Sequence, residues 1–461
     1  GNRDFYHLVK NSARNMIDKE KQNNLTDQNL LECAVDSIER NFSGIIFDDN
    51  RKASLEVYKN IFHEIYPGCQ VKKDYEVLKR IKENIHDINS RYLLIASDSS
   101  IGTILLSSIL EGDEKKYNFY IGSPFAQDLN SEEYALKVLN KIQSHMGRGN
   151  ILVLKNLESV YPSMYDLFNQ NFTIMSNKNY ARLAIGSNTN TLSYVDKDFR
   201  CIVNVDTKKL DQEEAPFLNR FEKHIMSFEF MMDEELIREA EKIKNTIDGF
   251  FNCNNKMFKA FSYDLKKLMI NCSREEIQAL VYNANKNGIK KENISDYVLE
   301  KIAMTLPQDI LVNLKINAQK HAKNLKKILS FYNKGEHSNF AKFLEKATQK
   351  NIVYTFSGYL EDFIEESDII NNNLVGEIKR KNIKTILLNS VKSERDFETN
   401  IDDYLEEENL KVCIIKFLPG EGTFMNYIKY FIENKMNEKE NCDKKIFVFI
   451  VYMSRIFLKE I

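Results

Sequence analysis

Short apolar runs that do not alternate with polar residues recur along this chain and are separated by helical stretches. Four lie between residues 75 and 230 and four follow residue 350: 92–96, 118–121, 151–154, 200–205, 352–356, 385–388, 412–417 and 446–451. A strand without polar alternation is buried on both faces, as in a parallel sheet whose crossover helices cover both sides. We therefore expect α/β modules of the doubly wound kind.

The segments around these runs divide the 461 residues into four parts. Apolar residues spaced by three and four predict helical subdomains at 1–74 and 246–350. An α/β core is expected at 75–245, and the start of a second core at 351–461. This alternation indicates an array of one repeated unit that is cut at both ends, so we interpret the chain, which begins with Gly1, as a fragment of a longer protein.

Composition excludes several classes of function. The 65 basic and 67 acidic residues give a formal charge of −2, so no general attraction to nucleic acid or anionic membranes is expected. The seven cysteines contain no CxxC pair, and the seven histidines lack ligand spacing, so we expect no metal site, no disulfide framework and reduced thiols in the cytosol. No apolar run approaches the roughly 18 residues of a membrane span.

An arginine near the end of the first α/β core is the leading candidate for a catalytic residue. It is Arg220, in Ala215-Pro216-Phe217-Leu218-Asn219-Arg220-Phe221-Glu222, which resembles the arginine-finger box of AAA+ ATPases. A guanidinium stays charged, and its planar fork fits a γ-phosphate oxygen. Supplied to a neighbouring module, it would stabilise the charge that develops in phosphoryl transfer. The alternative is a surface arginine at the start of a helix.

Two further patterns fit the same kind of module. Gly1-Asn2-Arg3 opens a helix in the Gly-x-Arg form of a sensor-2 arginine, with an exposed first-turn arginine as the alternative. Asp198-Phe199-Arg200 before an apolar run resembles the entry to a sensor-1 strand, which would put the polar residue that aligns water at Asn204 or Asp206. A capped edge strand is the alternative there.

The Walker B position in this core is degenerate. The run 151–154 ends where two acidic residues would bind Mg²⁺ and polarise the attacking water. The register set by Pro162 puts Lys155 and Asn156 there, and Glu158 lies two residues late. Lysine would repel a metal ion, and neither residue can act as a general base. We expect this site to be inactive.

The phosphate loop is degenerate as well. A working loop needs glycines whose backbone N–H groups wrap the phosphates, and a lysine on the β/γ oxygens. Ser97-Asp98-Ser99-Ser100-Ile101-Gly102-Thr103 leaves only Ser100, Gly102 and Thr103 as remnants, and no lysine occurs between Arg91 and Lys115. We therefore expect no nucleotide on the 75–350 module.

The second core also lacks catalytic groups. Leu418-Pro419-Gly420-Glu421-Gly422-Thr423 has no lysine and presents Glu421 to any phosphate, so we interpret it as a tight turn with a helix cap. We expect the Walker B counterpart at Phe449-Ile450-Val451-Tyr452-Met453-Ser454-Arg455, which contains no carboxylate.

Several stretches together resemble the mysterin family of giant ring-finger AAA+ ubiquitin ligases, whose six ATPase modules form a dynein-like row in one polypeptide. These are 1–10, 157–161, 165–170 and 216–224, continuing through 354–357 and 446–449 to Ser454-Arg455. The resemblance implies that 1–74 is the lid of the third module, 75–350 the fourth module with its lid, and 351–461 the start of the fifth. The implied fold is a P-loop NTPase-like parallel sheet with helical lids.

The resemblance also implies partners and cofactors. ATP and Mg²⁺ would bind in neighbouring modules of the same chain, and Arg220 with Arg3 would complete the third module's site. A ubiquitin-conjugating enzyme and substrate would bind far outside these residues, in a cytosolic protein that associates with lipid droplets and acts against intracellular microbes. No ring finger lies in these 461 residues. The alternatives are a purely structural scaffold of degenerate modules, or a dynein- or midasin-like ring without ligase function.

Overall fold

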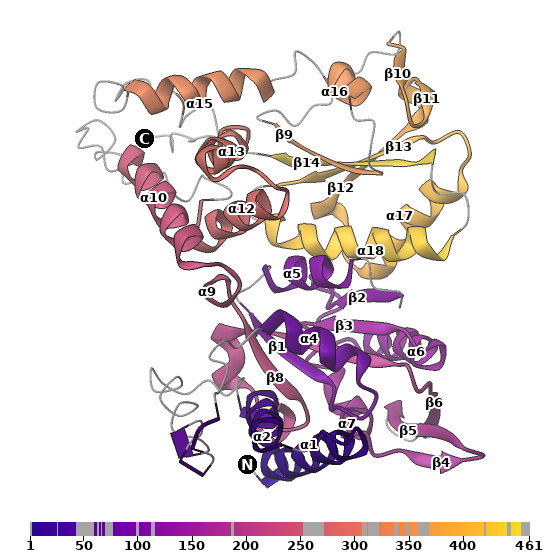
Figure 1. Ribbon diagram of the computed structural model, residues 1–461. Coiled ribbons are helices and arrows are strands. Elements are labelled where there is room, and N and C mark those ends of the chain that lie inside the picture. The colour runs from indigo at the N-terminus through magenta and orange to yellow at the C-terminus, as the bar shows by residue number, and fades with distance from the viewer. Residues whose placement is uncertain are drawn as a thin grey trace. The chain divides into compact units, whose positions relative to one another are not determined.

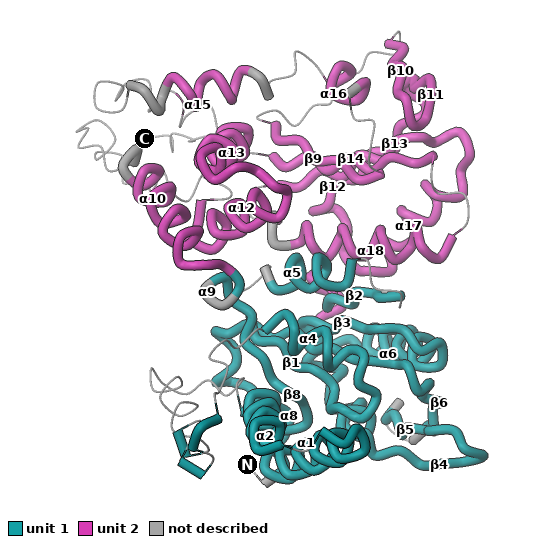
Figure 2. Tube along the Cα trace, in the orientation of Figure 1, with its two compact units in different colours: residues 1–122, 130–231 teal, residues 123–129, 232–461 magenta. Residues whose placement is uncertain are grey.

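The structure is a computed structural model that describes most of the chain. The described residues are 2–24, 26–42, 60–61, 64–65, 67–69, 77–97, 101–111, 116–185, 189–251, 272–306, 311, 322–335, 340–346, 351–357, 368–418, 421–439 and 444–452. They fall into two compact units, which are coloured teal and magenta in Figure 2. Unit 1 contains residues 1–122 and 130–231, and unit 2 contains residues 123–129 and 232–461.

Unit 1 is built on a five-stranded parallel sheet in the order β2-β3-β7-β1-β8 (Figure 1). The strands are β1 (Leu93–Ser97), β2 (Tyr117–Ile121), β3 (Ile151–Lys155), β7 (Arg200–Asp206) and β8 (Glu222–Met226). Helix α5 (Ile101–Leu110) lies between β1 and β2 in the chain, and α6 (Glu132–Arg148) lies between β2 and β3. The predicted α/β core is confirmed.

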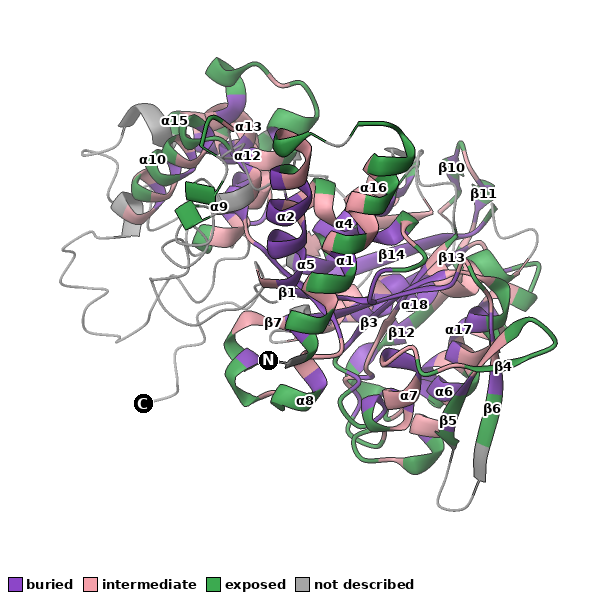
Figure 3. Cartoon of the chain, turned by 60° about the horizontal axis from the view of Figure 1, so that its bottom comes forward, coloured by how far each residue is buried: buried purple, intermediate pink, exposed green. Residues whose placement is uncertain are grey.

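Successive residues of β1, β3 and β7 are buried, so both faces of these strands are covered, as strands without polar alternation require (Figure 3). Leu94 and Leu152 belong to a core cluster with residues of α6, and the alternate residues Leu93 and Val153 are equally buried. From β1 the chain crosses to β2 on one side, and from β7 it crosses to β8 on the other. The carboxyl ends of β1 and β7 therefore form a topological switch point, where open α/β sheets bind ligands.

Helices from the N-terminal part of the chain pack against β8. They are α1 (Asn2–Lys21) and α2 (Asp27–Phe42), which contact each other, and α4 (Val77–His86). Both α2 and α4 contact β8. No apolar run predicted β8, because it begins Glu222-Lys223-His224, and all three side chains are buried. Polar partners from the helices replace the usual apolar neighbours.

An antiparallel sheet, also unpredicted, is inserted between β3 and β7. Its strands are β4 (Thr173–Met175), β5 (Lys178–Ile185) and β6 (Thr189–Val195), in that order. Ser176 and Asn177, both with positive φ, form the turn between β4 and β5. Before it come η1 (Tyr161–Met164) and α7 (Tyr165–Phe168), and β5 contacts both. The short elements η2 (Thr207–Gln212), α8 (Ala215–Leu218) and α9 (Phe228–Met231) complete unit 1.

Unit 2 begins with helices and continues into a second parallel sheet. The helices are α10 (Glu234–Phe251), α12 (Arg274–Lys286), α13 (Lys291–Ala303), α15 (Ala322–Gly335) and α16 (Phe340–Lys346). The sheet has the order β12-β13-β14-β9, from β9 (Ile352–Ser357), β12 (Ile383–Leu387), β13 (Val412–Phe417) and β14 (Ile446–Tyr452). A small hairpin, β10 (Ile370–Asn372) and β11 (Gly376–Ile378), precedes β12.

The second sheet corrects one sequence-based assignment. Its order matches β2-β3-β7-β1 of unit 1, so the counterpart of β3 is β13, and β14 corresponds to β7. The Walker B position is therefore the end of β13 at Phe417, and the expectation of residues 449–455 is wrong. Helix α17 (Glu394–Glu406) precedes β13, and η6 (Glu421–Phe424) and α18 (Met425–Glu438) follow it. Glu421 accepts a hydrogen bond from the Leu418 amide at 2.7 Å, as a turn would require.

Residues 123–129 belong to unit 2, although they follow β2 in the chain. Phe125 is 4% exposed, and its ring centroid lies 6.1 Å from that of Phe397 and 5.9 Å from that of Tyr427. The Glu394 amide donates to the Asp128 carboxylate at 2.6 Å. This segment therefore packs on the N-terminal parts of α17 and α18.

Candidate functional site

The backbone around Arg220 is fixed by two phenylalanines on either side of it in the sequence. Phe217 and Phe221 are 3% and 0% exposed. Phe217 stacks on Tyr161 with a centroid distance of 5.3 Å, and Phe221 lies 5.0 Å from Phe168. Because both aromatic partners belong to the helical stretch η1–α7, the predicted finger box is attached directly to that stretch.

The side chain of Arg220 lies over an aromatic ring. Its guanidinium carbon is 3.8 Å from the ring centroid of Tyr165, and its Nη1 donates to the carbonyl of Pro216. Arg220 forms no ion pair with any residue that the structure describes. Burial lowers its pKa and the nearby Arg3 charge lowers it further, while Tyr165 acts in the opposite sense. The group remains a cation at neutral pH because arginine side chains stay protonated in proteins.

Arg3 reaches the same helical turn from the N-terminal helix. It is exposed on the first turn of α1, and its Nη1 donates to the Asn169 side-chain oxygen at 2.6 Å. Asn169 is the C-cap residue of α7, four residues after Tyr165. The structure thus brings together the two arginines that the sequence singled out, and α7 contacts both.

The switch point of the sheet is occupied by the protein's own polar groups. Asn204 is 2% exposed, and its Nδ2 donates to Ser97 Oγ at 2.8 Å and to the Ile95 carbonyl at 3.1 Å. A Cβ added at Gly102 would overlap the Ser97 hydroxyl. The candidate sensor-1 residue Asn204 is therefore held inside the sheet, while Asp206 caps η2 by accepting from the Lys208 amide at 2.9 Å.

Of the phosphate-loop remnants, two can be described. Thr103 is fully buried in the first turn of α5, next to Gly102. Ser100 lies outside the described residues. A phosphate would need free backbone N–H groups and a positive side chain at this edge, and neither Gly102 nor Thr103 brings a positive charge.

At the Walker B position, Lys155 ends β3 and is 8% exposed. Burial lowers the pKa of Lys155 to about 8, with Asp206 opposing this shift and Lys209 adding to it. Asn156 follows with a φ of 53°, and Glu158 is exposed and pairs with Lys209 at 3.7 Å. A buried ammonium in place of a metal-binding carboxylate is a donor set that does not fit a magnesium–nucleotide complex.

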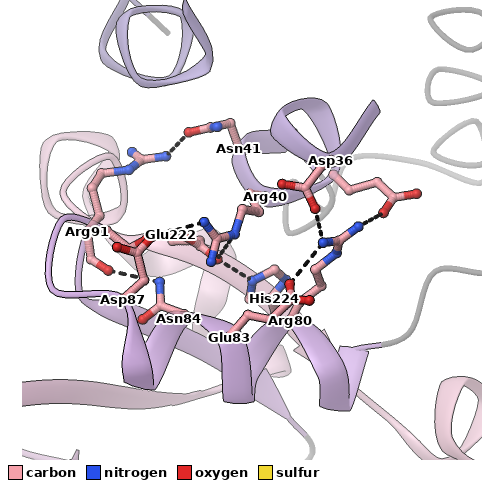
Figure 4. Close-up of polar contacts among 12 residues, drawn as sticks. Asp36, Arg40, Asn41, Arg80, Glu83, Asn84, Asp87, Arg91, Glu222 and His224 are labelled. Carbon is pink, nitrogen blue, oxygen red and sulfur yellow. Dashed lines mark hydrogen bonds and ion pairs between the residues drawn. The ribbon is translucent and has the colours of Figure 1, made fainter. Parts of the chain in front are cut away.

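Sequence reasoning missed a network of buried charges between the N-terminal helices and β8 (Figure 4). Asp4 accepts hydrogen bonds from Arg91 at 3.0 Å and from Lys223 at 3.1 Å, and all three side chains are buried. Glu222 lies 3.6 Å from Arg40 and 3.0 Å from His224. The only available signal was a strand-length segment of charged residues next to the finger box.

A second part of this network surrounds Asp87, which follows α4. Its carboxylate pairs with Arg14 at 2.6 Å and with Arg40 at 3.3 Å. Burial alone would raise the pKa of Asp87, but hydrogen bonds from Ser90 and the Asn89 amide, together with Arg14, lower it to about 2. Charges on α1 and α2 are thus matched by charges on the α/β core of unit 1.

Among the helices that the structure describes, none combines the length and the apolar character of a membrane span. No cluster of three or more potential metal-binding side chains occurs within the described ranges. The cysteines that can be described, at positions 33, 69, 201, 272 and 413, are free thiols.

Comparison with known proteins connects this geometry to one family. A family model described as the RNF213 AAA domain matches residues 82–232. The chain is 24% identical to mouse E3 ubiquitin-protein ligase RNF213 over 99% of its length, and 30% identical to zebrafish E3 ubiquitin-protein ligase rnf213-beta over 49%. It is also 28% identical, over 77% of its length, to a Dictyostelium discoideum protein named as an uncharacterized transmembrane protein.

The chain spans only a small part of each of these relatives. It covers 9% of the mouse protein, 4% of the zebrafish protein and 6% of the Dictyostelium protein. The matched range 82–232 contains all five strands of the unit 1 sheet, the α7 turn and Arg220. Residues 82–232 are therefore an AAA domain of the RNF213 type, and the chain as a whole is similar to RNF213 proteins.

Proposed function

We propose that this chain is part of the AAA+ motor of a longer, RNF213-like ubiquitin ligase. In this proposal its own AAA module does not hydrolyse ATP. Instead, Arg220 and Arg3 contact the phosphates of Mg²⁺–ATP bound by the preceding module of the same polypeptide. The single observation that carries the proposal is the convergence of these two arginines on α7, with Arg220 lacking an ion-pair partner among the described residues.

The electrostatics of the pair support binding of an anion. Two guanidinium groups held near each other repel, which is one reason that the pKa of Arg220 is lowered. A phosphate group placed between the two guanidinium groups would attract both of them and so offset their mutual repulsion. Arginine suits this role because its fork can donate two parallel hydrogen bonds to phosphate oxygens.

The outer face of α1 supports contact with a further protein module. Phe5, Tyr6 and Val9 are 62%, 63% and 52% exposed, whereas Asp4 and Asn11 on the opposite face are buried. A helix that packs its polar side inward and exposes large apolar side chains is suited to bury its apolar face against a neighbouring module. Arg3 lies on the first turn of this helix, so the neighbour would be close to it.

The degenerate nucleotide site of this module supports the proposal that the module supplies an arginine but does not hydrolyse ATP itself. Lys155 replaces an acidic residue, and Asn204 and Gly102 pack together around Ser97. Location in the cytosol, lipid-droplet association and contact with a ubiquitin-conjugating enzyme are proposals for the longer protein. A purely structural scaffold is the second candidate, and the buried charges between α1, α2 and the core favour it.

Substitution of Arg220 in the full-length protein tests the proposal. R220A should lower ATP hydrolysis at the preceding module's site by about 10³-fold or more, as loss of an arginine finger does elsewhere. R220K should not restore it, because an ammonium lacks the planar fork. R238A is the matched control, since Arg238 is exposed on α10 and is paired with Glu234 at 2.9 Å. ATP turnover by R220A equal to that of R238A would refute the finger role and favour the structural scaffold.

A further inference from the structure

The short helix α7 contacts both arginines through residues that the finger proposal does not use. Tyr165 and Asn169 are four residues apart, so they lie on the same side of the helical turn. The Asn169 amide donates to the Tyr165 carbonyl at 3.0 Å, which continues the helix through both positions. One residue supplies a ring face to Arg220, and the other supplies an acceptor to Arg3.

The helix is held firmly in unit 1. Leu167 and Phe168 are 0% and 1% exposed and point into the core cluster. Asp166 pairs with Arg182 of β5, and Gln170 donates to the Ser90 carbonyl just before β1 at 3.0 Å. A segment fixed on three sides provides a stable platform for the flexible side chains that rest on it.

Each contact restricts one arginine. A guanidinium 3.8 Å from a ring centroid is within stacking distance, and such stacking limits the rotamers of a long side chain. The Tyr165 hydroxyl forms no hydrogen bond to a described residue, so the ring face is the part that acts. The 2.6 Å bond from Arg3 to Asn169 is short, as expected for a charged donor.

We infer that Tyr165 and Asn169 are positioning residues that hold Arg220 and Arg3 as a preorganised pair for the phosphates of a nucleotide. This inference rests on the finger proposal above. The platform comes from the module that supplies Arg220, while Arg3 belongs to the lid assigned to the preceding module, which binds the nucleotide. Preorganisation of this kind raises the rate because the cations need not reorient as charge develops on the transferred phosphoryl group.

Variants of Tyr165 in the full-length protein test the inference through ATP turnover. Y165L removes the ring and should lower kcat about tenfold with a smaller change in KM, because stacking on the ring is worth about 1.4 kcal/mol. Y165F keeps the ring and should recover most of that loss. If Y165L and Y165F have equal kcat values, Tyr165 does not position Arg220.

A double-substitution cycle separates positioning from a general structural role. If Tyr165 acts through Arg220, Y165L should cause no further loss of turnover in the R220A background. An equal tenfold loss in both backgrounds would overturn the inference. Normal turnover by R220A would instead refute the finger proposal itself, so the two failures are distinguishable.

Asn169 gives a second, independent readout in case Y165L does not fold. N169A should lower kcat about threefold, and this loss should disappear in an R3A background, because the acceptor acts only on Arg3. Persistence of the loss in R3A would overturn the role of Asn169. The fold of each variant is checked by its thermal unfolding midpoint.

Discussion

Replacement of Asp4 by asparagine should destabilise unit 1 strongly, although Asp4 lies in the first turn of the first helix. Its carboxylate is 1% exposed and is the shared acceptor for Arg91 and Lys223, which are 5% and 6% exposed. In D4N two buried cations would face a neutral amide. Removal of one partner from a buried ion pair costs about 3–5 kcal/mol, because the remaining charge is left uncompensated in a buried site.

The loss of stability in D4N can be measured as a fall in Tm and as faster hydrogen exchange of individual backbone amides. For a unit of this size, a loss of that order lowers Tm by roughly 6–20 °C. Hydrogen exchange locates the effect, since amides of α1 and β8 should exchange roughly 10²- to 10³-fold faster in D4N. K223M should cost less than D4N, because Asp4 and Arg91 would remain as a balanced pair.

Asp18 provides the matched control on the same helix. Its side chain is 59% exposed and lies 4.0 Å from Lys21, a surface pair that contributes little. D18N should change Tm by less than a few degrees. Equal shifts for D4N and D18N would show that the buried carboxylate does not stabilise the attachment of α1, and the reasoning from buried charge would be refuted.

Two further predictions concern the sheet and its covering helix. G102A should lower the free energy of unfolding by about 1–3 kcal/mol, because its Cβ would overlap the Ser97 hydroxyl. G147A, on the exposed surface of α6, should instead raise the free energy of unfolding by about 0.5–1 kcal/mol. Urea unfolding that ranks the two variants the other way would contradict this prediction. Burial lowers the pKa of His145 to about 4, and Arg148 and Lys141 act in the same direction. The unfolded chain therefore binds the extra proton between about pH 6.5 and 4, and stability should fall as pH is lowered through that window, by about 1.4 kcal/mol per unit. H145Q should flatten this part of the pH profile of Tm, and an unchanged slope would exclude His145 as its source.

Most of the parallel sheets could be predicted from the sequence because their strands are apolar on both faces. Every predicted run corresponds to an observed strand, with boundaries that differ by at most two residues, as for β12. The prediction failed for β8, whose first three residues are charged or polar and are buried beside Asp4 and Arg40. Periodicity cannot reveal a strand whose core neighbours are ion pairs supplied by distant helices.

The β4–β6 insertion had a weaker signal. In β5 the buried Ala181 and Leu183 alternate with more exposed neighbours, which is the pattern of a half-buried strand. In β6 the buried position is taken by the polar Ser193, whereas the apolar Leu192 is 47% exposed. The usual pattern of buried apolar and exposed polar residues is therefore reversed. Composition alone could not place this strand.

The candidate site was partly predictable. Arg220 and Arg3 were identified from short motifs, but their convergence on α7 depends on the packing of Phe217 and Phe221 against residues far away in the sequence. The stretch 165–170 entered only as part of a family resemblance. Its contacts with both arginines are long-range, so no local pattern could have predicted Tyr165 or Asn169 as partners.

The assignment of residues 123–129 to unit 2 affects how this protein can be divided for experiments. Cleavage of the chain at a single point near residue 231 would not separate the two units, because the polypeptide passes from one to the other three times. A recombinant protein that starts at residue 232 would lack Phe125, and the rings of Phe397 and Tyr427 would lose their contacts with it. Poor solubility of such a truncated version would then reflect the missing seven-residue segment, and adding that segment as a peptide should correct it.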